Sequence, residues 1–206
     1  MAGMQFDKVH VVNTALSKLG LEASYSIDDE SPLGGKVDMA WLGVVAEVMM
    51  LHPWQQMRET VAVTQLARPP ANGWQYGFAL PADRVGDPLA ILTDVVRETY
   101  LRSFMLEGGK LFTNVTPVWV RVRKATDPQT WDMAFREAFA MALAGALAVP
   151  LLQDDDTEAL RRRDAFGDPR ELGGGGLFGK LIAVERAAQP QGRNFLTNSP
   201  LIAARK

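Results

Sequence analysis

Two hydrophobic periodicities occur in separate blocks of this chain, and their order restricts the fold. Apolar residues recur every three or four positions before residue 52 and again after residue 126, whereas they alternate with polar residues in between. These periods are typical of helices and strands respectively. A parallel sheet needs strands that alternate with helices, so this order excludes a wound α/β fold. We predict an α+β fold, a helix bundle with an inserted small antiparallel β-sheet domain and an extended C-terminal tail.

The first block predicts two helices. An amphipathic pattern runs from residue 6 to Gly20, a residue suited to ending a helix. Ser31 and Pro32 fit the N-cap and first position of a second helix. Pro53 should stop that helix, because proline disrupts the α conformation of the residue before it.

The last block predicts a long helix and several shorter segments. Asp127 and Pro128 fit its N-cap and first residue, and its alanines would let another helix approach closely. Pro150 should kink or end it, because its nitrogen cannot bond to the carbonyl of Ala146. The segments expected after it are a short charged surface helix over 154–163, flexible glycines over 173–176, a last helix over 177–188 and an extended tail over 189–206.

The middle block predicts strands, because valines and aromatic residues there alternate with other residues. The Glu107-Gly-Gly-Lys110 stretch is a plausible hairpin turn. The expected strands cover 57–66, 74–80, 100–106, a segment that starts at Leu111, and 118–123. We therefore expect a helical bundle over 1–55 and 127–188, an inserted β domain over 56–126, and a C-terminal docking tail over 189–206.

Composition removes most catalytic chemistries. The chain has no cysteine and only two histidines, His10 and His52, which leaves little for thiol catalysis, a zinc cage or a triad. A net charge of -2 argues against tight wrapping of nucleic acid. No apolar run approaches the roughly 20 residues of a membrane span, and the amphipathic N-terminal segment differs from a signal peptide. We expect a protein that is not an enzyme, uses no cofactor or metal and does not contact membranes.

One motif suggests an enzyme instead. Gly174 to Lys180 satisfies G-x-x-x-x-G-K, the pattern of a phosphate-binding loop. Such a loop follows a buried strand and ends in a hydroxyl that binds magnesium, whereas here residues 167–172 are polar and position 181 is Leu. We interpret the stretch as a flexible joint. A nucleotide- or phosphate-binding enzyme that uses this loop is the alternative.

Several short stretches, taken in order, resemble a known family. They are Val11 to Gly20, His52-Pro53-Trp54, Trp74-x-Tyr76-x-Phe78-x-Leu80-Pro81-x-Asp83, Phe104 to Leu111, and the Leu143-Ala and Leu147-Ala pairs of the alanine-rich helix. This ordered set resembles the head-to-tail adaptor of tailed bacteriophages, also called tail tubular protein A, and is similar to the adaptor of gene transfer agents. The resemblance covers residues 8–152, and the 154–176 segment departs from it.

The resemblance implies a structural role. Adaptors of this family form a dodecameric ring that joins the portal to the tail and extends the DNA channel. The implied partners are the portal protein, a tail tube or tail terminator (stopper) protein, other copies of the chain, and double-stranded DNA that passes without sequence-specific binding. The implied location is the head-tail junction of a virion or gene transfer agent particle that is made in the host cytoplasm. The C-terminal tail would dock on the portal through Phe195, Leu196, Leu201, Ile202 and Arg205.

Overall fold

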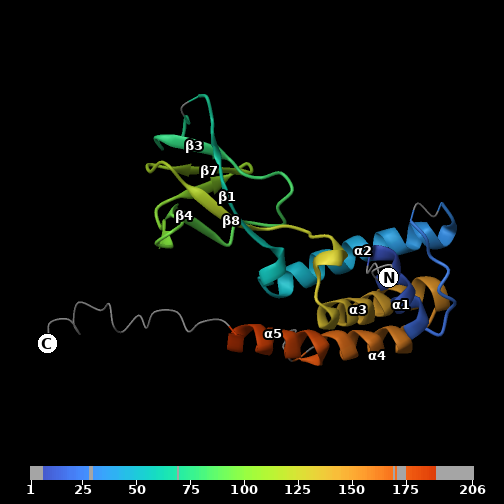
Figure 1. Ribbon diagram of the computed structural model, residues 1–206. Coiled ribbons are helices and arrows are strands. Elements are labelled where there is room, and N and C mark those ends of the chain that lie inside the picture. Colours follow the sequence, from blue (N-terminus) through green and yellow to red (C-terminus); the bar gives the residue numbers. More distant parts are fainter. Residues whose placement is uncertain (1–6, 28–29, 69, 169, 171–174, 189–206) are drawn as a thin grey trace, which may run out of the picture.

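The computed structural model describes residues 7–27, 30–68, 70–168, 170 and 175–188, and within them the chain has an α+β fold. Figure 1 shows a layer of helices with two small sheets above one end of it. The helices are α1 (Lys8–Lys18), α2 (Pro32–Leu51), α3 (Met133–Leu152), α4 (Asp155–Phe166) and α5 (Gly176–Ala188), with 3-10 turns η1 (Gln55–Met57) and η2 (Pro128–Thr130). The predicted α+β fold class is confirmed, and the expected extended tail over 189–206 lies outside the described residues.

The start of the second helix is as the sequence predicts. Ser31 is the N-cap of α2, its hydroxyl accepts a hydrogen bond from the Gly34 amide at 3.3 Å, and Pro32 is the first helical residue. The helix ends at Leu51, two residues before Pro53.

The start of the long helix was predicted wrongly. Asp127 caps only the 3-10 turn η2, where its carboxylate accepts a hydrogen bond from the backbone N–H of Gln129 at 2.8 Å. The α-helix begins six residues later, at Met133, where Asp132 accepts the Phe135 amide at 2.7 Å. Both aspartates can cap a helix, but only Asp132 is followed directly by the apolar residues of α3. Pro150 is accommodated within the last turn, and α3 ends two residues after it at Leu152.

The charged segment is more than the predicted surface helix. α4 extends to Phe166 and packs along α3, with Ala165 fully buried. The two helices lie close together at Gly145, where an added Cβ would lie 2.9 Å from Cγ of Arg162 and 3.2 Å from its backbone nitrogen. The small residues of α3 therefore allow another helix to pack closely against it, as the sequence predicts, and that helix is α4.

The strands form two sheets where one was predicted. One sheet has the order β1-β8-β4-β5 and the other β2-β3-β7-β6, and all pairings are antiparallel. The strands are β1 (Arg58–Ala62), β2 (Thr64–Gln65), β3 (Tyr76–Ala79), β4 (Ala90–Asp94), β5 (Thr99–Tyr100), β6 (Met105–Glu107), β7 (Lys110–Thr113) and β8 (Trp119–Arg123).

Three expectations about the strands need correction. The single strand expected over 57–66 breaks at Val63 and contributes to both sheets. The strand expected over 100–106 is two strands, with Tyr100 in one sheet and Met105 in the other. The strand β4 was not predicted, because Ile91 and Leu92 are both buried and no alternation marks it. The predicted hairpin is confirmed between β6 and β7, and Gly108 and Gly109 supply the positive φ angles of its turn.

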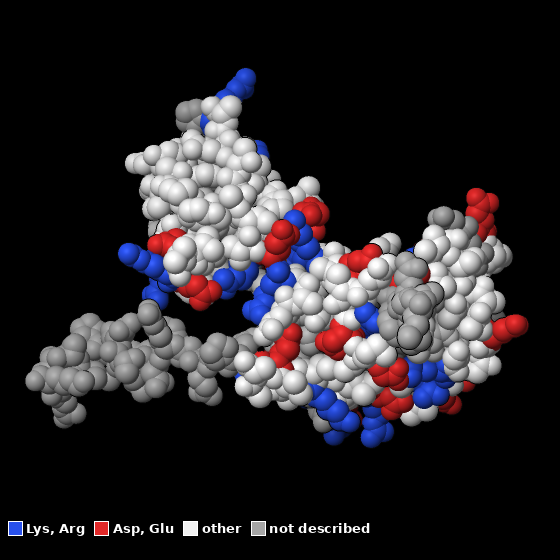
Figure 2. Space-filling view, viewed as in Figure 1, with Lys and Arg blue, Asp and Glu red and all other residues white. Residues whose placement is uncertain are grey.

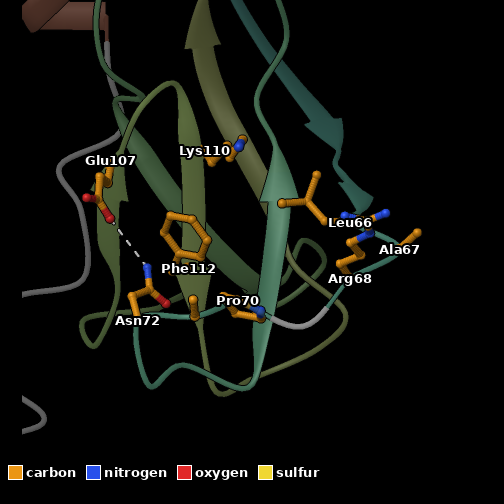
Figure 3. A pocket seen from close by; sticks show the side chains of 9 residues that line it. Leu66, Ala67, Arg68, Pro70, Asn72, Glu107, Lys110 and Phe112 are labelled. Carbon is orange, nitrogen blue, oxygen red and sulfur yellow. Dashed lines mark hydrogen bonds between the residues drawn. The ribbon is translucent and has the colours of Figure 1, made fainter.

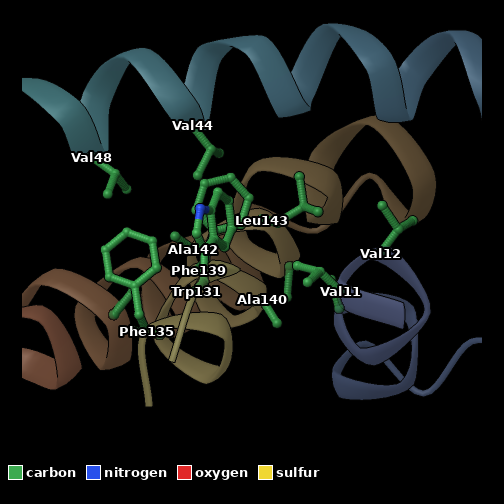
Figure 4. Packing of buried hydrophobic residues seen from close by; sticks show 14 of the residues in the cluster. Val11, Val12, Val44, Val48, Trp131, Phe135, Phe139, Ala140, Ala142 and Leu143 are labelled. Carbon is green, nitrogen blue, oxygen red and sulfur yellow. The ribbon is translucent and has the colours of Figure 1, made fainter. Parts of the chain in front are cut away.

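The buried apolar residues form two clusters. The larger one surrounds α3. Figure 4 shows Trp131, Phe135 and Phe139 on the side of Val44 and Val48 of α2, and Ala140 and Leu143 on the side of Val11 and Val12 of α1. The smaller one lies between the sheets and includes Phe78 and Leu111. The sequence analysis found no apolar run long enough for a membrane span, but α3 is long and apolar enough for one. Its most apolar 18-residue window has a mean hydropathy of 1.5, and 56% of that window is buried. That burial identifies it as the central helix of the larger cluster.

Candidate functional site

The chain passes twice between the helices and the sheets, and these two crossings form the candidate site. The first crossing runs from the end of α2 through η1 to β1, and the second runs from β8 through η2 to α3 (Figure 1). Two of the stretches that carry the family resemblance, residues 52–54 and 80–83, lie at these crossings or beside them. We refer to this region as the junction.

Trp54 anchors the first crossing in the helical core. Its side chain is only 2% exposed, and its indole nitrogen donates to the carbonyl of Val48 at 2.7 Å. Its ring packs edge-on against the ring of Phe135, with 5.1 Å between the two centroids. The ring of Phe178 lies on it at a tilt, with 5.7 Å between centroids. One aromatic side chain thus holds α3 and α5 against the end of α2.

His52 and Glu185 connect the same crossing to α5. The His52 Nε2 atom lies 2.8 Å from one carboxylate oxygen of Glu185. The other carboxylate oxygen accepts a hydrogen bond from the backbone N–H of Gln55 at 3.0 Å. Both side chains are largely buried, with relative exposures of 7% and 18%. Glu185 lies one helical turn before the end of α5, and the C-terminal tail follows directly. The geometry therefore fixes the end of α5 to the junction.

Asp83 belongs to an ion-pair group at the second crossing. Lys124 binds Glu59 at 2.7 Å and Asp83 at 3.0 Å. The hydrogen bonds that the Lys124 ammonium donates to Glu59 and to Asp83 raise the pKa of Lys124 above its usual value. The Lys124 amide also donates to the carbonyl of Met57 at 2.9 Å, so the two crossings are hydrogen-bonded to each other.

The remaining residues of the Trp74–Asp83 stretch pack or shape the backbone. Phe78 and Leu80 are buried in the cluster between the sheets, and Tyr76 lies against Phe78 with 6.5 Å between ring centroids. Trp74 is half-buried just before β3, and the carbonyl of Pro81 accepts a hydrogen bond from Arg84. These positions indicate a scaffold role.

The sequence analysis did not identify two parts of the junction. Glu185 lies in a helix far along the chain from His52, and nothing in its neighbourhood marks it as the partner. The arginines Arg58, Arg84 and Arg123 lie on strands β1 and β8 or in the loop beside them, and strand register alone brings Arg58 opposite Arg123.

Two pockets in the described part of the chain are lined by residues other than His52, Trp54 and Glu185. One, of about 610 Å³, is at the far end of the sheets between the 66–72 loop and β7 (Figure 3). Its charged residues are Arg68, Glu107 and Lys110, and Asn72 donates to Glu107 at 3.4 Å. A second, of about 510 Å³, lies between α2 and α4 beside the ion pair of Glu47 with Arg162. Among the described residues, neither pocket is lined by a histidine, serine, threonine or tyrosine.

The glycine-rich loop follows a helix. α4 is the element before it, and Lys180 is exposed on the first turns of α5, while Gly174 lies outside the described residues. Within the described part of the chain, no group of three histidine, aspartate or glutamate side chains is placed to hold a metal ion. The predicted docking residues Phe195, Leu196, Leu201, Ile202 and Arg205 also lie outside the described residues.

Comparison with known proteins leaves the geometry as the basis for function. No known family description matches the chain, and no curated protein is significantly similar to it.

Proposed function

We propose that this protein is a structural head-to-tail adaptor of a phage or phage-like particle. It forms a ring that joins the portal to the tail and extends the channel through which DNA passes. Its partners in this role are the portal protein, a tail tube or terminator protein and other copies of itself. It acts at the head-tail junction of the particle and catalyses no reaction.

The connection of α5 to the junction carries this proposal. Glu185 bonds to both His52 and the backbone N–H of Gln55, so the end of α5, from which the tail continues in sequence, is held by one part-buried and one exposed hydrogen bond to a carboxylate. The tail itself contains apolar Phe195, Leu196, Leu201 and Ile202, which suit a partner groove. A firmly held base with an apolar end is the arrangement that a docking tail requires, since a fixed base reduces the entropy lost on binding.

The motif residues also support a scaffold rather than an active site. Trp54 and Phe78 are buried in the two clusters, and Asp83 binds Lys124. Packing and ion pairing are the roles that a protein joining two larger assemblies requires of such residues.

Co-sedimentation with portal rings tests the function. We expect the full chain to sediment with the rings, and a chain that lacks residues 195–206 to remain in the supernatant while its unfolding midpoint is unchanged. Lys180→Ala is the matched control, and we expect it to bind portal like the parent. Equal binding of the truncated and full chains would contradict the proposed docking role. A thermal shift with millimolar nucleotide that Lys180→Ala abolishes would support the phosphate-loop enzyme instead.

A further inference from the structure

One face of α2 is apolar and exposed. Met39, Leu42 and Met50 are 79%, 70% and 63% exposed, and the exposed Gly43 and Ala46 lie between them. These residues are spaced three or four apart, so they share one side of the helix. The opposite side already packs into the core through valines. Exposed Lys36, Asp38 and Glu47 lie beside this stripe. An exposed apolar patch with polar residues around it is typical of an interaction surface.

Unpaired positive charge lies at one end of this face. An added Cβ on Gly86 would lie 3.8 Å from both Sδ of Met50 and Nη1 of Arg123, which places that arginine beside the stripe. Arg123 is directly opposite Arg58 across β1 and β8, and such like charges repel. The Nε atoms of Arg84 and Arg123 are buried without a hydrogen-bond partner among the described residues.

Two of the nearby carboxylates are already paired, and Asp87, next to Gly86, is exposed and forms no ion pair with the described residues. Glu59 and Asp83 are bound to Lys124. Figure 2 shows Lys and Arg side chains, with acidic ones among them, in the recess between the sheets and the helices. The outer face of α2 together with this recess therefore fits an apolar segment that has carboxylates at one end.

α4 offers this on part of its surface: the helix is strongly polar overall and exposes Arg163 near its end, but Ala159 and Leu160 are exposed beside its acidic first turn. Asp155 and Asp156 are exposed in its first turn, and Leu160, 52% exposed, follows one turn after Asp156 on the same side. The chain's own tail is a poorer match, because residues 189–206 include Arg193, Arg205 and Lys206 and no acidic side chain. Charge complementarity thus selects α4 of a second copy.

We propose that the outer face of α2 in one copy binds the outward face of α4 in the next. Leu160 packs against Ala46 and Met50, and Asp155 and Asp156 face Arg84 and Arg123. The two surfaces are different parts of the chain, so the contact is heterologous and leads to a ring or an open filament. This inference rests on the proposed ring-forming function and names the surfaces that build the ring.

Cysteine cross-linking tests the contact, because the chain has no cysteine of its own. Ala46→Cys and Ala159→Cys are prepared as separate full-length variants, both at exposed positions, and are treated with a short bismaleimide at high protein concentration. We expect a cross-linked dimer when the two variants are mixed and little when each is treated alone. The control mixes Ala46→Cys with Val96→Cys, which is 93% exposed on the sheet side, and should yield several-fold less dimer.

A charge exchange tests the orientation. Asp156→Arg in the Ala159→Cys chain should lower the cross-link yield about tenfold, and Arg123→Glu in the Ala46→Cys chain should restore part of it. A dimer of Ala46→Cys alone would mean that α2 pairs with α2, and this would overturn the proposal. So would a mixed yield no higher than that of the Val96→Cys control.

Portal co-sedimentation of the same variants separates this inference from the proposed function. Variants that bind portal without forming the mixed cross-link would refute the named surfaces and leave the adaptor role standing. If the unmodified chain does not bind portal rings, the adaptor role is refuted, whatever the cross-linking result.

Discussion

At the residue scale, a few buried polar contacts decide how the parts of the molecule are held together. Glu185 uses both carboxylate oxygens, one for His52 and one for the Gln55 amide. Trp54 uses its ring for packing and its nitrogen for the Val48 carbonyl. Because each of these side chains bridges two elements, their loss should affect the whole junction.

We predict that Glu185→Ala lowers the free energy of unfolding by about 2 kcal/mol, because it leaves His52 and the Gln55 amide without their charged acceptor. Glu185→Gln keeps an oxygen for one of these donors and should cost less. Arg186→Ala, at an exposed neighbouring position, is the control and should change stability by less than about 0.5 kcal/mol. Urea unfolding measures all three, and equal stability of the Ala variant and the parent would contradict the assigned contact.

At the element scale, the sequence predicts the helices better than the sheets. Caps such as Ser31 and the 3.6-residue period are local signals, so α2 and the hairpin turn at Gly108 were predicted closely. The division of the strands into two sheets depends on which strands pair, and β4 has no alternation to reveal it. Likewise, the His52–Glu185 contact joins distant segments, and only the packing of α5 creates it.

We predict opposite effects of two glycine substitutions in helices. Gly145→Ala should destabilise the protein by about 1–3 kcal/mol, because the new methyl group meets Arg162 of α4, including its backbone. Gly43→Ala should stabilise it by up to about 1 kcal/mol, because alanine favours the helix and nothing lies within 4 Å. Thermal or urea unfolding compares the two. A stabilising Gly145→Ala would show that α3 and α4 are further apart than described.

Acid should weaken the N-terminus of α4. Hydrogen bonds from the Thr157 hydroxyl and amide lower the pKa of Asp154, the N-cap. A carboxyl whose folded-state pKa is lowered contributes stability above its ordinary pKa, and that contribution disappears as the pH falls through the folded value. We therefore predict that the parent loses stability in acid more steeply than Asp154→Asn, as followed by urea unfolding at a series of pH values. Identical pH profiles would contradict this role of Asp154.

At the scale of the whole molecule, the proposed adaptor combines three features. The junction holds the sheets and helices together, α5 carries the tail, and the outer faces of α2 and α4 are available to other copies. Each feature corresponds to a separate variant: Glu185→Ala for the junction, truncation at 195 for the tail, and the cysteine pair for the contact between copies. If all three serve one function, each variant should disturb assembly at a different step.

Negative-stain imaging of the purified chain, alone and mixed with candidate portal rings, tests the central claim most directly. The adaptor proposal predicts rings, or an added layer of density on one face of the portal, and loss of that layer when residues 195–206 are removed. Dispersed monomers both with and without the portal would contradict it.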